Sequence, residues 1–278
     1  FVNLMYIVLL VILLLTLFIF FQSYTCKEEF SHGISFETIL QDIVFINIQN
    51  ILPCTQIKGL DCIYCITVNG RKDYIRNIFH NYGMVEVNFI EACTPTTLTS
   101  YDYEKYSTTM EKNSKIYNLM TKLPVHLSYL SCLYHADTSG YKNILIFEDD
   151  VYFEKPFTKL KEIIEDFLSK KAGDILYLGY CNLDCETKVE IIDENIAKLP
   201  PDSRILCKHG MVHNTAYVKK LIQNHKKLDA KSDIYLNDFY SMMNIKRVVV
   251  RKPFIYQNRQ LLKSYNDNPS KLLSTCLF

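Results

Sequence analysis

The sequence predicts an α/β domain built on a mostly parallel central sheet that is flanked by helices. Three apolar runs carry this prediction, at residues 62–68 (CIYCITV), 143–147 (NILIF) and 174–180 (DILYLGY). Continuous apolar runs of this length are expected for strands that are buried on both faces of a parallel sheet. Helix-like stretches separate them, and strand, helix, strand is the repeating unit of such sheets.

Turn and helix signals place the remaining elements in order. The run at 62–68 is followed by Asn69-Gly70, a dipeptide typical of turns. Gly140 ends a long helical stretch just before the run at 143–147. Residues 95–115 are rich in Thr, Ser, Tyr and Lys and predict a long loop. The expected helices are 73–82, 125–138, 157–170 and 216–226, and further strands are expected at 85–93 and within 245–257.

Composition limits the class of protein. The chain has 278 residues, of which 49% are hydrophobic and 22% charged, so it can form one domain of about 200 to 250 residues with appendages. We place this domain at 59–262, after a stem at 22–58 and before a tail at 263–278. The net charge of +1 provides no general attraction to nucleic acid, and no nucleic-acid partner is predicted.

The N-terminal segment 4–21 (LMYIVLLVILLLTLFIFF) is apolar and uncharged. A helix of this length just crosses a bilayer core of about 30 Å. The segment therefore predicts a transmembrane signal-anchor. A cleaved signal peptide is the alternative, although its apolar region is usually shorter and ends at a small-x-small site. We expect a single-pass membrane protein whose main domain lies in the secretory-pathway lumen or is otherwise extracytoplasmic.

Ten cysteines are present, and Cys62 and Cys65 form the one CxxC pair. Residues three apart on a strand point to opposite faces, so this pair is not expected to share a metal ion. Cys181 and Cys185 flank a loop-like stretch. They could form a disulfide with each other or with Cys207 in an oxidising compartment.

Three acidic residues, Glu148, Asp149 and Asp150, follow directly after the apolar run at 143–147. In open α/β sheets, ligands bind beyond the carboxyl ends of the strands. Adjacent carboxylates repel one another, and a divalent cation such as Mg²⁺ or Mn²⁺ is the natural compensation. The alternative is a solvated acidic turn before the helix at Phe157. Because side chains alternate along an extended chain, Glu148 and Asp150 should point together and Asp149 away from them.

The stretch LSYLSCLYHADTSGYKNILIFEDDVYFEKPF, residues 127–157, resembles glycosyltransferase family 25. In that family a helix with a Cys-x-x-His element precedes a strand that ends in Glu-Asp-Asp-Val. Here these are Cys132, His135 and Glu148 to Val151. Weaker similarity extends over about 60–258, through CITVNGRKDYIR, TAYVKKLI, SDIYL and Gln257, although Ser131 stands where the family usually has Gly.

The resemblance implies a GT-A-type fold that binds a nucleotide-diphosphate sugar with Mn²⁺ or Mg²⁺ and transfers a hexose with inversion. UDP-galactose or UDP-glucose is the implied donor, and a hydroxyl of a glycan, a lipooligosaccharide or a collagen-like protein is the implied acceptor. The resemblance implies the following roles: metal ligands Asp150, Glu148 and, from the later histidines, His213, with His209 the alternative; donor contacts Arg71, Arg76, Glu148, Asp149 and His135; general base Asp233, with Asp238 the alternate.

Each of these residues also has a structural interpretation. His135 could be a buried structural histidine, the two arginines could be exposed charges, and the two later aspartates could be surface or helix-capping carboxylates. Two other functions therefore stay open. One is a membrane-tethered, catalytically inactive binding module of GT-A type, and the other is a phosphohydrolase with clustered aspartates.

Overall fold

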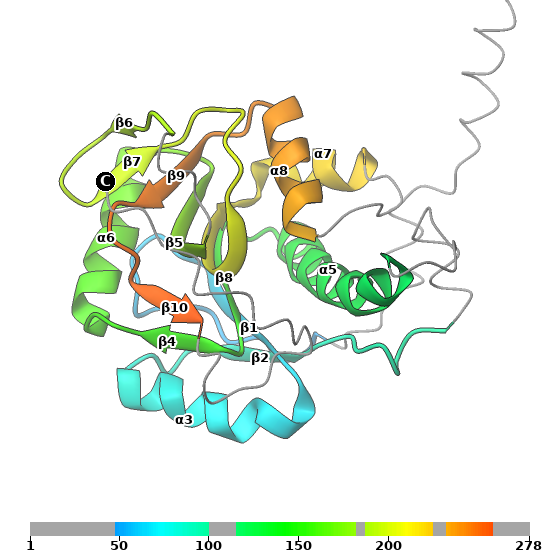
Figure 1. The fold of residues 1–278 in the computed structure, drawn as a ribbon. Helices are drawn as coiled ribbons and strands as arrows, with labels where there is room; N and C mark the ends of the chain where they lie inside the picture. Colours follow the sequence, from blue (N-terminus) through cyan, green and yellow to red (C-terminus); the bar gives the residue numbers. More distant parts are fainter. Residues whose placement is uncertain (1–47, 100–114, 182–186, 225–231, 258–278) are drawn as a thin grey trace, which may run out of the picture. The chain divides into compact units, whose positions relative to one another are not determined.

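The computed structural model describes residues 48–99, 115–181, 187–224 and 232–257, which all belong to one compact unit. These residues form an α/β structure around one large sheet (Figure 1). The predicted α/β class with a mostly parallel central sheet is therefore confirmed, whereas the GT-A type of the fold stays a prediction. The predicted tail at 263–278 and the stem up to residue 47 lie outside the described residues.

The large sheet has eight strands in the order β2-β1-β3-β8-β5-β9-β7-β6, and a small sheet pairs β10 with β4. Strand pairings show that β2, β1, β3, β5, β9 and β6 run in one direction, whereas β8 and β7 run in the other. The strands are β1 (Cys62–Thr67), β2 (Asn88–Glu91), β3 (Asn143–Glu148), β4 (Val151–Phe153), β5 (Ile175–Cys181), β6 (Glu190–Ile191), β7 (Ile196–Lys198), β8 (Leu206–Asn214), β9 (Arg247–Val250) and β10 (Ile255–Gln257).

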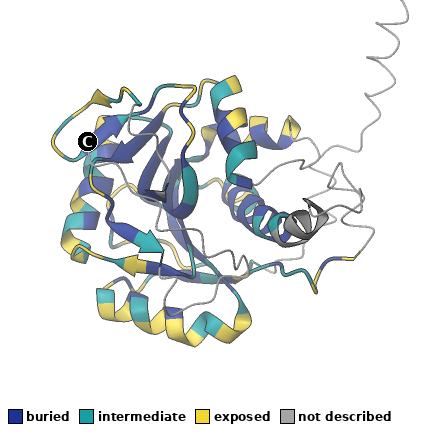
Figure 2. Ribbon diagram, viewed as in Figure 1, coloured by how far each residue is buried: buried dark blue, intermediate teal, exposed yellow. Residues whose placement is uncertain are grey.

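Helices cover both faces of this sheet (Figure 1). Helix α5 packs on one face, where the ring of Tyr129 contacts His213 of β8. Helix α3 packs on the other face, where the ring of Phe79 contacts Phe147 of β3. Figure 2 shows that the central strands are buried while the outer sides of the helices are exposed. The helices are η1 (Asn69–Arg71), α3 (Lys72–Tyr82), α5 (Lys115–Thr138), α6 (Phe157–Lys170), η2 (Thr215–Tyr217), α7 (Val218–Gln223) and α8 (Ser232–Met242).

Most of the predicted elements are present, and the differences have local causes. The helix predicted from residue 125 begins at Lys115 and continues through Pro124. Proline lacks the N–H that bonds to the preceding turn, so a sequence pattern favours a boundary there. Strand β8 was not predicted, because its sequence LCKHGMVHN mixes charged and apolar residues although most of it is buried.

Two glycines allow the small sheet to lie directly against the large one. A Cβ atom on Gly179 of β5 would overlap the carbonyl oxygen of Ile255, and one on Gly210 of β8 would crowd the Ile255 and Phe147 side chains. Strand β10 can therefore cross closely over β5 and β8. This close approach brings Gln257 to the end of β3.

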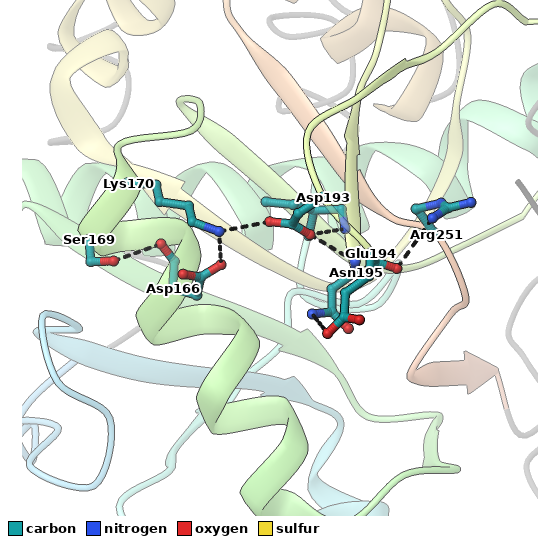
Figure 3. A network of polar contacts seen from close by, with 8 residues as sticks. Asp166, Ser169, Lys170, Asp193, Glu194, Asn195 and Arg251 are labelled. Atoms are coloured by element: carbon teal, nitrogen blue, oxygen red, sulfur yellow. Dashed lines mark hydrogen bonds and ion pairs between the residues drawn. The ribbon is translucent and has the colours of Figure 1, made fainter.

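A surface network ties the end of α6 to the β6–β7 turn (Figure 3). Lys170 Nζ donates to Asp166 at 2.6 Å and to Asp193 at 2.9 Å. The other carboxylate oxygen of Asp193 accepts hydrogen bonds from the backbone N–H groups of Asn195 and Ile196. Exposed ion pairs contribute little stability, so the network mainly fixes the shape of the turn.

The predicted location needs correction. In the part of the chain that the structure describes, no helix is both long and apolar enough to span a bilayer. The predicted span at 4–21 lies outside the described residues. The single-pass assignment, the membrane contact and the lumenal or extracytoplasmic location that depended on it are therefore withdrawn.

Candidate active site

Three potential metal ligands converge where the end of β3 meets the start of β8. Glu148, Asp150 and His209 each offer a ligand atom, and these atoms all lie within 4.8 Å of one another. His209 Nδ1 is 3.8 Å from a carboxylate oxygen of Glu148. The register pairs Phe147 with Gly210, which places His209 beside the end of β3. The antiparallel direction of β8 thus supplies the histidine.

Asp150 is the most buried of the acidic residues, at 7% exposure. Its Oδ2 atom accepts a hydrogen bond from Gln257 Nε2, whereas its buried Oδ1 atom has no hydrogen-bond partner among the described residues. Burial, followed by repulsion from Glu148, raises the pKa of Asp150 to about 6. A charged carboxylate with an unsatisfied buried oxygen is costly unless another group compensates it.

Glu148 responds to its surroundings in the opposite way. Burial acts to raise the pKa of Glu148, but the contact with His209 and the positive charge of Lys208 outweigh it and leave the pKa lowered. Glu148 is therefore held as a carboxylate. Two acidic groups of unlike pKa thus lie side by side, an arrangement that is frequent at functional sites.

The three groups fit a divalent cation. The unsatisfied Oδ1 atom of Asp150 offers a ligand position, and the charge of Glu148 offers a second. Carboxylates suit Mg²⁺, Ca²⁺ and Mn²⁺, while the imidazole of His209 shifts the preference toward a transition ion.

Asp149 points away from this cluster. Its carboxylate accepts hydrogen bonds from Val68 N at 3.1 Å and Thr67 Oγ1 at 3.2 Å, and it pairs with Arg71 Nη1 at 3.2 Å. The side chain therefore ties the end of β3 to the loop that follows β1. Arg71 is thereby held beside the edge at which the carboxylates gather.

Two predicted donor contacts lie elsewhere in the fold. Arg76 pairs with Asp73 at 3.0 Å and lies over the ring of Phe89, on the exposed side of α3. His135 is in the last turn of α5, where its Nδ1 atom is 2.8 Å from Tyr64 Oη. Burial lowers the pKa of His135. The structure does not bring either side chain to the carboxylates.

The structure places His213, a predicted metal ligand, at the far end of β8 and outside the cluster of Glu148, Asp150 and His209. It pairs with Ile144, four residues before Glu148, which is roughly 13 Å along an extended strand. Its ring nitrogens are bonded to the hydroxyls of Tyr129 and Tyr217. Burial lowers the pKa of His213 to about 3, so it stays neutral in the core.

The two candidate bases have different surroundings. Asp233, in the first turn of α8, accepts a hydrogen bond from Cys207 N at 3.0 Å and lies 3.9 Å from Lys208 Nζ. Asp238 faces outward, with its side chain 61% exposed, and pairs with Arg204 at 3.5 Å. Asp233 is therefore connected to β8 just before His209, whereas Asp238 lies on the exterior.

Sequence reasoning gave no role to Lys208 or Gln257, both of which contact acidic residues of the site. Lys208 stands directly before His209 in a stretch that mixes charged and apolar residues, so no local pattern identifies it. Cys207 is disulfide-bonded, while Cys54, Cys62, Cys65, Cys93 and Cys132 are not in disulfides. Cys185 and the side chain of Cys181, which were predicted to form a disulfide with each other or with Cys207, lie outside the described part of the chain.

The sequence model of glycosyltransferase family 25 (LPS biosynthesis protein) matches residues 66–236. This match covers more than half of the chain. The chain belongs to glycosyltransferase family 25. It is thus a glycosyltransferase, and the matched range contains the Glu148, Asp150 and His209 cluster together with Asp233.

Other comparisons add little to this assignment of the family 25 enzyme. No curated protein matches its sequence. Among solved structures, UDP-glucose pyrophosphorylase complexed with UDP-glucose aligns with a TM-score of 0.37 and 8% identity over 69% of this chain and 74% of that chain. A197 from STIV aligns with a TM-score of 0.34 and 8% identity over 69% of this chain and 82% of that chain. Mannose-1-phosphate geranyltransferase from Thermus thermophilus aligns with a TM-score of 0.32 and 9% identity over 68% of this chain and 72% of that chain. Scores this low carry no argument about activity.

Proposed function

We propose that this family 25 enzyme transfers a hexose from a UDP-sugar to an acceptor hydroxyl in a reaction that depends on a divalent cation. The observation that carries the proposal is the convergence of Glu148, Asp150 and His209, with a buried Asp150 oxygen that receives no hydrogen bond from the described residues. UDP-galactose and UDP-glucose are the proposed donors. A glycan, a lipooligosaccharide or a collagen-like protein is the proposed acceptor.

The cation would be Mn²⁺, held by Glu148, Asp150 and His209. When bound, it would supply positive charge to a leaving diphosphate. Gln257 orients the Asp150 carboxylate through the hydrogen bond to Oδ2, which leaves Oδ1 available as a ligand. Arg71, which Asp149 holds at the same edge, is proposed to bind the donor phosphates.

Asp233 is the proposed general base. In an inverting transfer, the acceptor oxygen attacks the anomeric carbon as the bond to the diphosphate breaks, and a carboxylate takes the acceptor's proton. Asp233 is partly exposed, with 27% of its side chain accessible, and its connection to β8 keeps it near the metal cluster. Asp238 is disfavoured because it faces outward.

Alternative functions make different demands on the structure. A phosphohydrolase with clustered aspartates would need a second acidic or histidine cluster. Within the described residues, Glu148, Asp150 and His209 form the one group of three or more possible metal ligands. An inactive binding module would bind a cation and a donor without turnover, so an assay of donor turnover distinguishes it from an enzyme.

The test is UDP release by the full chain from UDP-galactose and UDP-glucose, with Mn²⁺, Mg²⁺ or Ca²⁺. Lactose and a hydroxylysine-containing collagen-like peptide serve as acceptors. We expect Mn²⁺-dependent turnover that Asp150→Asn abolishes. Glu162→Gln, an exposed carboxylate on α6 that pairs with Lys159, is the matched control and should keep wild-type activity. Binding without turnover, or an active Asp150→Asn variant, would contradict the proposal.

A further inference from the structure

Lys208 is a buried cation next to the proposed metal ligands. The residue is 3% exposed and stands directly before His209 on β8. Its Nζ atom donates to Ser232 Oγ at 2.7 Å and lies 4.4 Å from the centre of the Tyr129 ring. Lysine is rarely buried unless it is paired. Groups from α5 and α8 therefore converge on this one ammonium group.

The direction of the hydrogen bonds follows from the chemistry of lysine. An ammonium group can only donate, so Ser232 Oγ accepts from Lys208. The Ser232 hydroxyl hydrogen is then available to His126 Nδ1, 2.8 Å away on α5. This chain of contacts joins β8 to the first residue of α8 and to α5. Loss of the ammonium group would release the start of α8.

Asp233 is the next residue along α8, and β8 holds it at both carboxylate oxygens. Oδ2 accepts from the Cys207 backbone N–H at 3.0 Å, and Oδ1 lies 3.9 Å from Lys208 Nζ. Cys207 has a φ angle of 69°, in the left-handed region that residues other than glycine seldom adopt. The Cys207 N–H and the Lys208 ammonium, from adjacent residues, both face the Asp233 carboxylate. Such unusual backbone conformations cluster at functional sites.

We propose that Lys208 is the positioning residue of the acceptor half of the reaction: it fixes the first turn of α8 so that the Asp233 carboxylate meets the acceptor hydroxyl. This inference rests on the proposed function, in which Asp233 is the general base. Lys208 acts through Asp233 and does not itself contact the donor. Because a misplacement of about 1 Å can cost about 100-fold in rate, loss of Lys208 should affect turnover far more than binding.

The test compares wild type, Lys208→Met, Lys208→Arg and Ser232→Ala as full chains. Methionine keeps an unbranched apolar stem, in a side chain one heavy atom shorter than that of lysine, and removes the charge. We expect Lys208→Met to lower kcat for transfer about 100-fold, while KM for the UDP-sugar and the affinity for Mn²⁺ change less than about threefold. Lys208→Arg should recover part of the loss. Lys198→Met removes an exposed lysine that pairs with Glu190 and should change nothing.

Three results would overturn the inference. Unchanged kcat in Lys208→Met excludes a positioning role. A loss of Mn²⁺ affinity with kcat preserved would show that Lys208 serves Glu148 instead. If Lys208→Met does not fold, Ser232→Ala decides, because wild-type kcat in that variant would exclude the role. If wild type turns over none of the donors, the proposed function itself fails. That outcome is distinct from the three above, which compare the variants with an active wild type.

Discussion

Replacing Asp150 with asparagine is expected to stabilise the metal-free protein at alkaline pH and to abolish its stabilisation by Mn²⁺. Burial, and then repulsion from Glu148, holds the pKa of Asp150 at about 6, against an ordinary value of 3.8. This difference corresponds to about 3 kcal/mol of unfavourable interaction for the charged carboxylate. Asparagine has the same size and keeps an oxygen that can accept the hydrogen bond from Gln257.

The sign of the pH dependence follows from the direction of this pKa change. Because the pKa of Asp150 is higher in the folded protein, the folded state binds more protons between about pH 4 and pH 6. The contribution of Asp150 to the free energy of unfolding therefore falls as pH rises through this window. The difference between Asp150→Asn and wild type should be near zero at about pH 4 and approach about 3 kcal/mol above about pH 7.

The assay is urea unfolding of both full-length proteins in chelator, at several pH values, followed by repetition with Mn²⁺. Wild type should gain stability from Mn²⁺, as expected for a ligand that binds the folded state, and the variant should not. Glu162→Gln is the control and should follow wild type throughout. If Asp150→Asn is less stable than wild type at alkaline pH, or if the difference does not depend on pH, the account of the Asp150 carboxylate is refuted.

Four other substitutions test separate parts of the structure. His209→Ala should lower the affinity for Mn²⁺ at least about tenfold in calorimetry. His213→Ala should leave that affinity unchanged and lower the free energy of unfolding by about 2 kcal/mol, because the hydroxyls of Tyr129 and Tyr217 each lose a buried hydrogen bond to the imidazole. Gly179→Ala should lower the free energy of unfolding by more than about 3 kcal/mol in urea, because the added Cβ would overlap the Ile255 carbonyl oxygen. Arg71→Ala should raise KM for the UDP-sugar in steady-state kinetics while Mn²⁺ affinity stays constant.

The sequence was most informative where a local pattern and the fold agree. The runs that became β1 and β3 are apolar because both faces of each strand are covered, and helix α6 matches its predicted bounds. Alternation along an extended chain also anticipated that Glu148 and Asp150 would face one way and Asp149 the other.

Other features depend on contacts that no local pattern contains. Strand β8 contains a lysine and two histidines, which are tolerated in a core strand because side chains of other elements contact them. Ser232 bonds to Lys208, Tyr129 bonds to His213, and Glu148 faces His209. Strand β4 has three residues and is stabilised by pairing with β10, which is about a hundred residues away in the sequence. Gln257 therefore reaches Asp150 only once the chain is folded.

The choice between His209 and His213 shows what decides such cases. The two residues are four apart, so on a strand both point to the same face, and alternation cannot separate them. In a parallel strand, the later residue would lie at the carboxyl edge beside Glu148. Strand β8 instead runs antiparallel to β3, so its first half lies at that edge and its second half in the core. Strand direction is a property of the whole sheet, and it assigns His209 to the carboxylates and His213 to the tyrosines.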